Sequence, residues 1–331
     1  MKDAWRVLGL LVALLCMTPA IQAADIRFAS GKSALAIPFE LADTRIDNHI
    51  FLQVSINGSS PLYFILDTGA SHTILSLRNA KSLSLKLQPI GKVVGGIGAE
   101  HSDAYLVSDK VSLELPGVVL SDRSLVAVPL DMTEQCIGTR QGPKRVVDGI
   151  LGADFFRSFV VEIDYAARLI NLYDPASYSY AGKGRSLPLQ MDPSYIFVQA
   201  QLEAAGRALV TARLVVDTGS GAALSLLKKF AETNRLLPSR EKLAAVPDCG
   251  INGPASEPAL VGELDALQLA DVKISKPVTV FYKEAPAPGD GLLGNPVLRK
   301  FKVIFDYSRN RMILERKVTN RSPIRSRAAQ Q

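Results

Sequence analysis

Short stretches that alternate apolar and polar residues recur along the chain, and most have the length of a β-strand. Residues 50–56 (IFLQVSI) alternate in this way, Asn57-Gly58 follows as a hairpin signal, and residues 62–66 run apolar toward Asp67. A period of two is typical of strands with one buried face, and Asn-Gly favours the tight turn between two such strands. The pattern therefore predicts a β-hairpin that ends at an aspartate.

Similar patterns predict strands in the rest of the chain. Residues 159–172 and residues 301–314 each show two apolar runs around a short polar turn, which is the signature of a hairpin. Residues 224–235 (LSLLKKFAETNR) are the best candidate for a helix. Many short strands with few helices predict an all-β fold built from barrels.

The chain repeats itself: five blocks of sequence occur twice, in the same order. They are residues 37–41 with 187–191, 50–54 with 196–200, 66–69 with 216–219, 107–126 with 261–280, and 148–152 with 290–294. Chance similarity between apolar strands explains one such block but not five in register. We therefore predict two homologous lobes, residues 24–180 and 181–315, joined through the polar stretch Asp174–Lys183.

The N-terminus has the features of a signal peptide over residues 1–23. The apolar run at residues 7–17 is too short to span a bilayer, which takes roughly 20 residues, and Ala23 ends a plausible cleavage site. An uncleaved anchor and a buried helix are the alternatives. Cys16 fits a lipoprotein signal poorly because bulky Leu15 precedes it. We expect an exported protein, periplasmic or secreted, without a transmembrane span after cleavage.

The net charge of +6 comes largely from the C-terminus. Residues 316–331 carry five basic residues and no acid, and residues 24–315 are formally neutral. Without a basic patch, aromatic interleaving or zinc-finger spacing, this charge does not indicate nucleic-acid binding. We expect a solvated, disordered tail that could still approach an anionic membrane surface.

Each lobe carries one Asp-Thr-Gly at the end of an apolar strand, at residues 67–69 and 217–219. An aspartate in such a place is costly unless its carboxylate receives hydrogen bonds. A two-fold axis between homologous lobes would bring Asp67 and Asp217 together. Two carboxylates that share a site cannot both ionise cheaply, so one keeps a proton, and the pair can act as acid and base on a water.

This pattern resembles the aspartic peptidases, pepsin-like in having two lobes on one chain and retropepsin-like in the compactness of each lobe. The residues that carry the resemblance are Asp67–Ala70, Asp217–Ser220, Ile150-Leu151-Gly152 and Leu292-Leu293-Gly294. It is most similar to bacterial exported proteins that contain two retropepsin-like domains in one chain. The resemblance implies two acid-protease-type β-barrel lobes with an active-site cleft between them.

The resemblance also implies roles for individual residues. The catalytic pair is Asp67 and Asp217. Other residues support the catalytic loops, with the threonines tying the two loops together: Thr68, Gly69, Ala70, Thr218, Gly219 and Ser220. A strand beneath each loop is formed by Ile150, Leu151, Gly152, Leu292, Leu293 and Gly294. A flap over residues 93–104 has its tip at Gly95, Gly96, Ile97 and Gly98, and residues 249–258 are a second flap or a vestige of one.

The expected activity is that of a monomeric aspartic endopeptidase that acts on a peptide or protein substrate and needs no metal or cofactor. The alternatives are a non-catalytic two-lobed module that binds peptides or proteins, and a processing protease with few native substrates. Ala70 stands where the other loop has Ser220, so we expect an asymmetric pair in which the Ser220 hydroxyl lowers the pKa of Asp217.

Other residues of the sequence are rival candidates to the aspartate pair. Export leaves Cys136 and Cys249, which either form one disulfide or remain two unpaired small residues. His72 is expected at the surface or at a strand end. Asp148 and Asp290 are the main rival carboxylates, and turn formation is their simpler explanation.

Overall fold

The computed structural model describes most of the chain between residues 26 and 316. The described residues are 26–29, 33–42, 48–92, 103–131, 146–204, 206, 208–247, 249–250, 253–283 and 288–316. The expected signal peptide, the flap tip at residues 95–98, Cys136 and the tail after Arg316 lie outside them.

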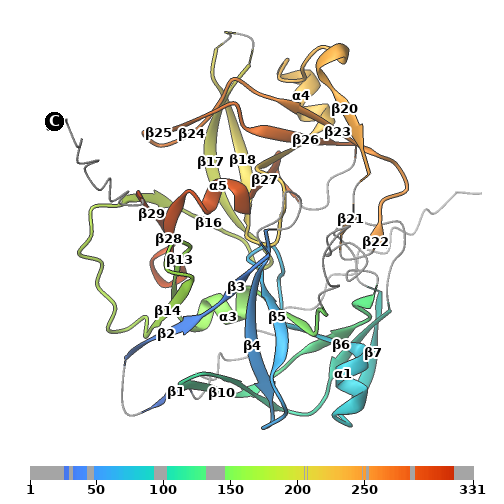
Figure 1. Cartoon of the computed structure of the whole chain (residues 1–331), viewed down its shortest axis with the longest axis vertical. Helices are drawn as coiled ribbons and strands as arrows, with labels where there is room; N and C mark the ends of the chain where they lie inside the picture. The colour runs from blue at the N-terminus through green and yellow to red at the C-terminus, as the bar shows by residue number, and fades with distance from the viewer. Residues whose placement is uncertain are drawn as a thin grey trace, which may run out of the picture.

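Within the described ranges, the N-terminal lobe is built around an eleven-stranded sheet (Figure 1). Its order is β1 (Ile26–Phe28), β10 (Val118–Arg123), β9 (Val111–Leu115), β4 (Ile50–Ile56), β5 (Leu62–Leu66), β12 (Gly149–Leu151), β6 (Ile74–Ser76), β11 (Val126–Val128), β8 (Asp103–Val107) and β7 (Leu87–Lys92), with β3 (Glu40–Leu41) paired to β4.

The C-terminal lobe repeats this order in a ten-stranded sheet. The order is β20 (Ala244–Val246), β23 (Ala259–Glu263), β26 (Val278–Tyr282), β19 (Leu224–Leu227), β27 (Gly291–Gly294), β18 (Val210–Asp217), β17 (Ile196–Glu203), β24 (Ala266–Leu269) and β25 (Val272–Ser275), with β16 (Gln190–Met191) paired to β17. The run β4-β5-β12-β6-β11-β8-β7 corresponds to β17-β18-β27-β19-β26-β23-β20. The duplication found in the sequence is therefore a duplication of topology.

A third, six-stranded sheet takes three strands from each half of the chain. Its order is β15 (Arg185–Pro188), β29 (Arg311–Arg316), β28 (Phe301–Asp306), β13 (Val160–Asp164), β14 (Leu169–Tyr173) and β2 (Ala34–Pro38). The halves meet where β13 pairs antiparallel with β28. A small hairpin of β21 (Cys249–Gly250) and β22 (Gly253–Pro254) lies at the position of the expected second flap.

Helices are short in the described part of the chain: α1 (Leu77–Ser82), α3 (Ala153–Ser158), α4 (Lys228–Thr233), α5 (Asn295–Leu298) and the 3-10 turns η2 (Arg240–Lys242) and η3 (Tyr307–Arg309). The all-β prediction is confirmed. The helix expected over residues 224–235 is only partly present, because residues 224–227 form β19 and the helix begins at Lys228. Leu224, Ser225 and Leu226 are consecutively buried between β26 and β27, which suits a central strand rather than a helix with one apolar face.

The predicted hairpins are present, and their turns follow from local chemistry. Asn57 and Gly58, between β4 and β5, both have positive φ, 50° and 74°. A two-residue turn with positive φ at both positions matches the right-handed twist of the strands, and Asn-Gly tolerates it best. This turn sets the register that places Asp67 immediately after β5.

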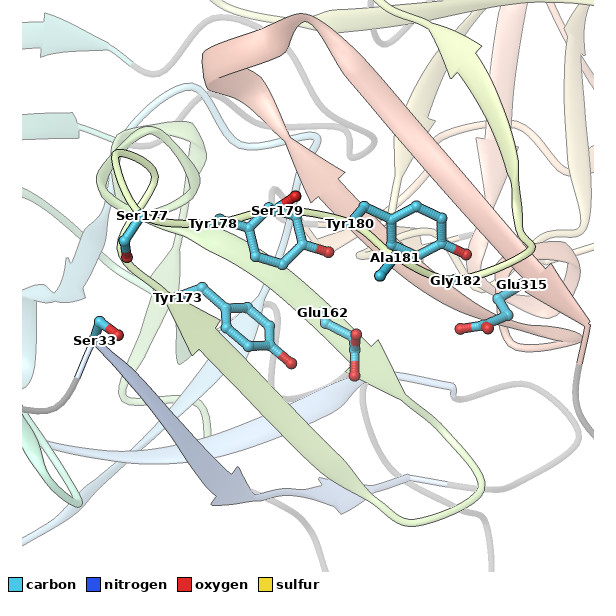
Figure 2. A pocket seen from close by; sticks show the side chains of 10 residues that line it. All are labelled: Ser33, Glu162, Tyr173, Ser177, Tyr178, Ser179, Tyr180, Ala181, Gly182 and Glu315. Atoms are coloured by element: carbon cyan, nitrogen blue, oxygen red, sulfur yellow. The ribbon is translucent and has the colours of Figure 1, made fainter.

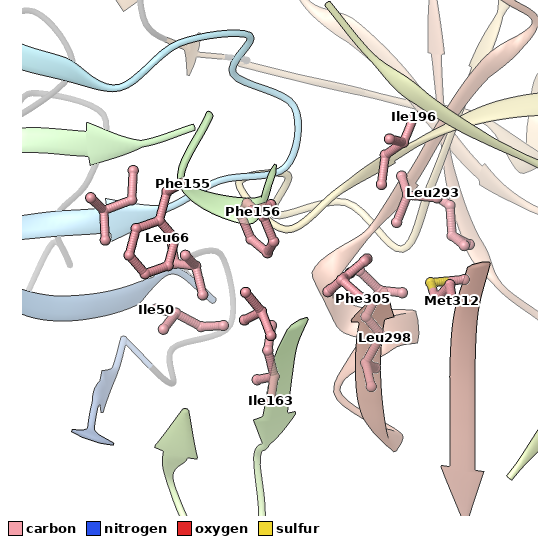
Figure 3. Close-up of a cluster of buried hydrophobic side chains, with 14 of the residues drawn as sticks. Ile50, Leu66, Phe155, Phe156, Ile163, Ile196, Leu293, Leu298, Phe305 and Met312 are labelled. Carbon is pink, nitrogen blue, oxygen red and sulfur yellow. The ribbon is translucent and has the colours of Figure 1, made fainter. Parts of the chain in front are cut away.

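The hydrophobic core is continuous from one lobe to the other (Figure 3). Phe156 of α3 stacks on Tyr307 with ring centroids 5.7 Å apart and meets Phe305 edge-on at 5.4 Å. A buried polar contact joins the lobes as well, since Tyr165 Oη donates to Asn295 Oδ1 at 2.5 Å. Burial of these rings on both sides fixes how the lobes face each other.

Candidate active site

Each aspartate loop rests on the apolar-apolar-Gly strand of its own lobe. β12 runs parallel to β5, and the Asp67 N–H donates to Leu151 O at 3.0 Å. β27 runs parallel to β18, which ends at Asp217. Beyond these strands, Ala153 N donates to Ala70 O at 2.8 Å, and Asn295 N donates to Ser220 O at 3.1 Å. The two elements that the resemblance assigned to loop support thus lie beneath the loops.

Thr68 and Thr218 cross between the lobes and are both fully buried. The Thr68 hydroxyl donates to Val216 O at 2.7 Å and accepts from Thr218 N at 3.0 Å. The Thr218 hydroxyl donates to Leu66 O at 2.9 Å and accepts from Thr68 N at 3.0 Å. Four hydrogen bonds between opposite loops, related by a two-fold axis, lock the loops to each other.

The glycines of the two loops lie against the opposite carboxylates. A Cβ added to Gly69 would lie 2.7–2.9 Å from the carboxyl atoms of Asp217, and one added to Gly219 would lie 2.5–2.7 Å from those of Asp67. Each glycine N–H also donates to the aspartate of its own loop, at 2.7 Å for Gly69 and 2.8 Å for Gly219. Glycine is needed here because any side chain would occupy the space of a carboxylate.

The two carboxylates form a coupled pair. Burial raises the pKa of Asp217 well above its usual value, and the charge of Asp67 and a side-chain hydrogen bond with Asp67 raise it further. Backbone N–H groups of Gly219 and Ser220 oppose this by stabilising the ionised form. A proton shared between the two side chains satisfies the hydrogen bond and avoids two adjacent buried charges.

Ser220 acts on Asp217 through its main chain. Its backbone N–H, rather than its hydroxyl, stabilises the ionised form of Asp217. The hydroxyl accepts a hydrogen bond from Ala222 N at 3.4 Å. Burial and Asp67 outweigh the backbone N–H groups, so the pKa of Asp217 is raised, and an asymmetry caused by the Ser220 hydroxyl stays a prediction.

The rival carboxylates are structural. Asp148 Oδ2 accepts from Tyr63 N at 2.9 Å, and Asp290 Oδ2 accepts from Arg213 N at 2.8 Å. These are equivalent positions of the repeat. In each lobe the contact fastens the beginning of the supporting strand to the strand that leads to the aspartate of the Asp-Thr-Gly loop.

Tyr195 is a residue near the pair that the sequence reasoning missed. Phe197 pairs with Val215, so continuing the antiparallel register places Tyr195 across from Asp217 on the same face. Tyr195 packs against Phe197 and the neighbouring apolar residues. Burial raises the pKa of Tyr195, and the charges of Asp217, Asp192 and Asp67 raise it further, so both carboxylates of the pair act on this phenol.

The internal repeat in the sequence could have pointed to Tyr195. The same continuation of register in the other lobe, where Phe51 pairs with Ile65, places His49 across from Asp67. The repeat offset that matches residues 50–54 with 196–200 also matches His49 with Tyr195. The equivalent register position is thus aromatic in both lobes.

Other predicted residues lie apart from the pair or outside the described ranges. His72 is exposed and its Nδ1 lies 2.9 Å from Ser71 Oγ, as expected for a surface position. The flap tip and Cys136 lie outside the described residues, so the flap and the disulfide remain predictions. Within the described ranges, no three His, Cys, Asp or Glu side chains are grouped to hold a metal ion.

Comparison with known proteins agrees with this geometry for the first lobe. Residues 52–155 match the aspartyl protease family. The match includes the Asp67 loop and its supporting strand β12. No curated protein sequence matches the chain. Among solved structures, basic 7S globulin from soybean is similar with 11% identity and a TM-score of 0.48, covering 87% of this chain and 95% of that one. In the part of the chain that the structure describes, no helix has the length and apolar character needed to cross a membrane.

Proposed function

We propose that this protein is an aspartic-type endopeptidase whose catalytic pair is Asp67 and Asp217. The observation that carries the proposal is the pair of loops locked by Thr68 and Thr218, which sets each carboxylate against the glycine of the other loop. A merely structural aspartate would not need a second carboxylate held against it in a partly buried place.

The chemistry follows from one proton shared by two carboxylates. Asp217, whose pKa is raised, holds the proton, and Asp67 accepts a proton from the attacking water. The water oxygen bonds to the carbonyl carbon of the scissile peptide, and Asp217 gives its proton to the carbonyl oxygen to form a tetrahedral diol. Asp67 then passes its proton to the leaving nitrogen as the C–N bond breaks, and the diol returns a proton to Asp217.

The substrate is a peptide or protein segment that lies extended between the lobes, with its scissile carbonyl above the two carboxylates. We place the protein outside the cytoplasm, periplasmic or secreted and monomeric, because the sequence has a signal-peptide pattern and one chain supplies both aspartates. Neither a nucleic acid nor a cofactor has a role in this proposal.

The test is cleavage of a diverse peptide library, followed by mass spectrometry across pH 3–7. We expect internal cleavage by the mature chain and none by Asp67→Asn or Asp217→Asn. Asp271→Asn is the matched control, since Asp271 is an exposed aspartate of the same lobe as Asp217. Circular dichroism verifies that each variant is folded.

Two outcomes would redirect the proposal. Normal cleavage by either asparagine variant would refute the shared-carboxylate mechanism. Binding of library peptides without cleavage by the unmodified protein would instead favour the non-catalytic binding module.

A further inference from the structure

A cavity of about 490 Å³ lies on the six-stranded sheet, and none of its lining residues belongs to the candidate active site. Its floor is formed by Glu162 of β13, Tyr173 of β14 and Glu315 of β29, and its roof by residues 177–182 (Figure 2). Since β13 and β29 come from different halves of the chain, the cavity bridges the two lobes.

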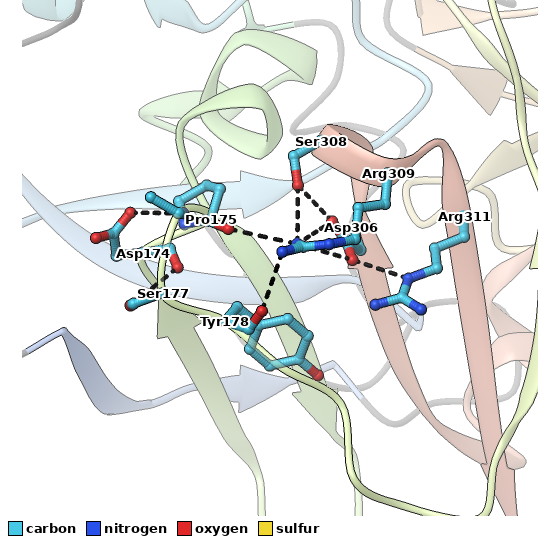
Figure 4. Close-up of polar contacts among 9 residues, drawn as sticks. Asp174, Pro175, Ser177, Tyr178, Asp306, Ser308, Arg309 and Arg311 are labelled. Atoms are coloured by element: carbon cyan, nitrogen blue, oxygen red, sulfur yellow. Dashed lines mark hydrogen bonds and ion pairs between the residues drawn. The ribbon is translucent and has the colours of Figure 1, made fainter.

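The roof is held in place by contacts with Arg309 of η3, the turn between β28 and β29, and by a hydrogen bond of its own. Arg309 donates to Pro175 O at 3.3 Å through Nη1 and to Tyr178 O at 3.1 Å through Nη2 (Figure 4). Tyr180 Oη accepts from Gly184 N at 2.5 Å. The cavity is therefore formed before any ligand binds, which lowers the entropic cost of binding.

The floor carries more negative than positive charge. Lys302 Nζ lies 3.6 Å from Glu162 and 3.5 Å from Asp164, and it faces Glu315 across the β28–β29 pair. Burial lowers the pKa of Lys302, but these three carboxylates outweigh burial and raise it. Asn171 Nδ2 also donates to Glu162 at 2.8 Å. One cation thus serves three carboxylates, and Glu315 makes no hydrogen bond or ion pair with any described residue.

Aromatic rings complete the cavity wall beside these acids. The Tyr173 and Tyr178 rings lie 4.9 Å apart, tilted by 47°. Burial raises the pKa of both phenols, and Glu162 raises it further, so both are neutral at physiological pH. Neutral tyrosine faces next to carboxylates favour a planar cation, which can stack on a ring and donate two hydrogen bonds to an acid. An anion would be repelled, and an apolar group would leave the Glu315 carboxylate without a partner among the described residues.

We infer that this cavity binds a guanidinium group supplied by the chain's own C-terminal segment, residues 317–331. That segment carries Lys317, Arg321, Arg325 and Arg327 and no acid. β29 ends at Arg316, directly after Glu315 of the cavity floor. Five extended residues reach about 17 Å, so Arg321 can turn back to the cavity. Because the segment is tethered, its effective concentration is of millimolar order. Bound there, it would brace the sheet that joins the lobes.

The experiment measures competition for the cavity by isothermal titration calorimetry with N-acetyl-L-arginine amide. It uses the full mature chain and a full-length variant in which Lys317, Arg321, Arg325 and Arg327 are replaced by Gln. We expect the variant to bind the arginine amide. The unmodified chain should bind it with an affinity at least about ten-fold lower, because its own tail occupies the site.

Two controls assign the binding to the cavity acids. In the tail variant, Glu315→Gln should weaken binding about ten-fold, whereas Glu263→Gln, at an exposed acid of β23, should not change it. N-acetyl-L-citrulline amide keeps the shape of the arginine amide without its charge, so it should not bind to the tail variant. This control changes the ligand and leaves the cavity residues as they are. Each of four results would overturn the inference. They are no binding of the arginine amide by the tail variant, equal binding of it by both chains, binding of the citrulline analogue as strong as that of the arginine amide, and unchanged binding after Glu315→Gln.

Discussion

Replacing Thr218 by valine isolates the energy of the crossing between the two Asp-Thr-Gly loops. Valine has nearly the shape of threonine, so the change removes the hydroxyl and leaves the packing. Two buried groups of the opposite loop then lose their partner: Thr68 N–H, at 3.0 Å, and Leu66 O, at 2.9 Å. Each buried polar group without a partner costs about 1–3 kcal/mol, so we expect a loss of about 2–6 kcal/mol in the free energy of unfolding.

The measurement is urea unfolding followed by far-UV circular dichroism, with a matched control in the same lobe. Thr279 is also fully buried, and its hydroxyl makes one hydrogen bond, to Pro277 O at 3.0 Å. Thr279→Val should therefore cost about half as much as Thr218→Val. Thr218→Ser keeps the hydroxyl and should cost about 1 kcal/mol, for the lost methyl group.

A double-mutant cycle tests whether the crossing acts as one unit. After Thr218→Val the loops can move apart and admit water, so adding Thr68→Val should cost at least about 1 kcal/mol less than it does alone. If Thr218→Val costs no more than Thr279→Val, or if the two valine changes are additive, the crossing does not hold the lobes together as described.

Two further predictions concern the charges at the site. The folded protein keeps a proton on Asp217 that the unfolded chain releases near pH 4, so its stability falls as pH rises from about 4 to the raised pKa of Asp217. Asp217→Asn should thus gain urea resistance relative to the unmodified protein between pH 4 and pH 7, and a difference that does not change with pH would contradict the raised pKa. Tyr195→Phe removes a phenol that can stabilise an ionised carboxylate, so the acidic limb of the kcat profile should shift upward by about half a pH unit or more. Tyr63→Phe, at a partly exposed tyrosine of the other lobe, should leave the profile unchanged, and an identical profile for both variants would exclude a role for Tyr195.

The strands and turns were predictable because their signals are local. The alternation in residues 50–56 and the Asn57-Gly58 turn are set by neighbours within a few residues, and the structure has both. The prediction for residues 224–227 failed because their burial comes from β26 and β27, which lie tens of residues away in the chain. A run of buried leucines has no periodicity that distinguishes a central strand from a helix.

The candidate site was predictable in its residues and in its main contacts, but not in every contact. The Asp-Thr-Gly at residues 67–69, its repeat at residues 217–219 and the supporting strands could be named from the repeat and the resemblance. The role of Ser220 could not, because only the folded loop decides that its backbone N–H acts on Asp217 while its hydroxyl accepts from Ala222. Tyr195 was missed since its link to Asp217 follows from strand register rather than from a motif.

The sequence by itself determined that this protein consists of two copies of one all-β lobe, each ending a strand in Asp-Thr-Gly, because periodicity and duplication are written in residue order. The tertiary structure alone decided which backbone groups the Thr68 and Thr218 crossing joins, that Asp217 is the aspartate with the raised pKa, and that Glu162 and Glu315 border one cavity. These properties arise between residues that are about 150 positions apart. Their energies depend on distance, burial and competing partners, which exist only once the two lobes have packed together.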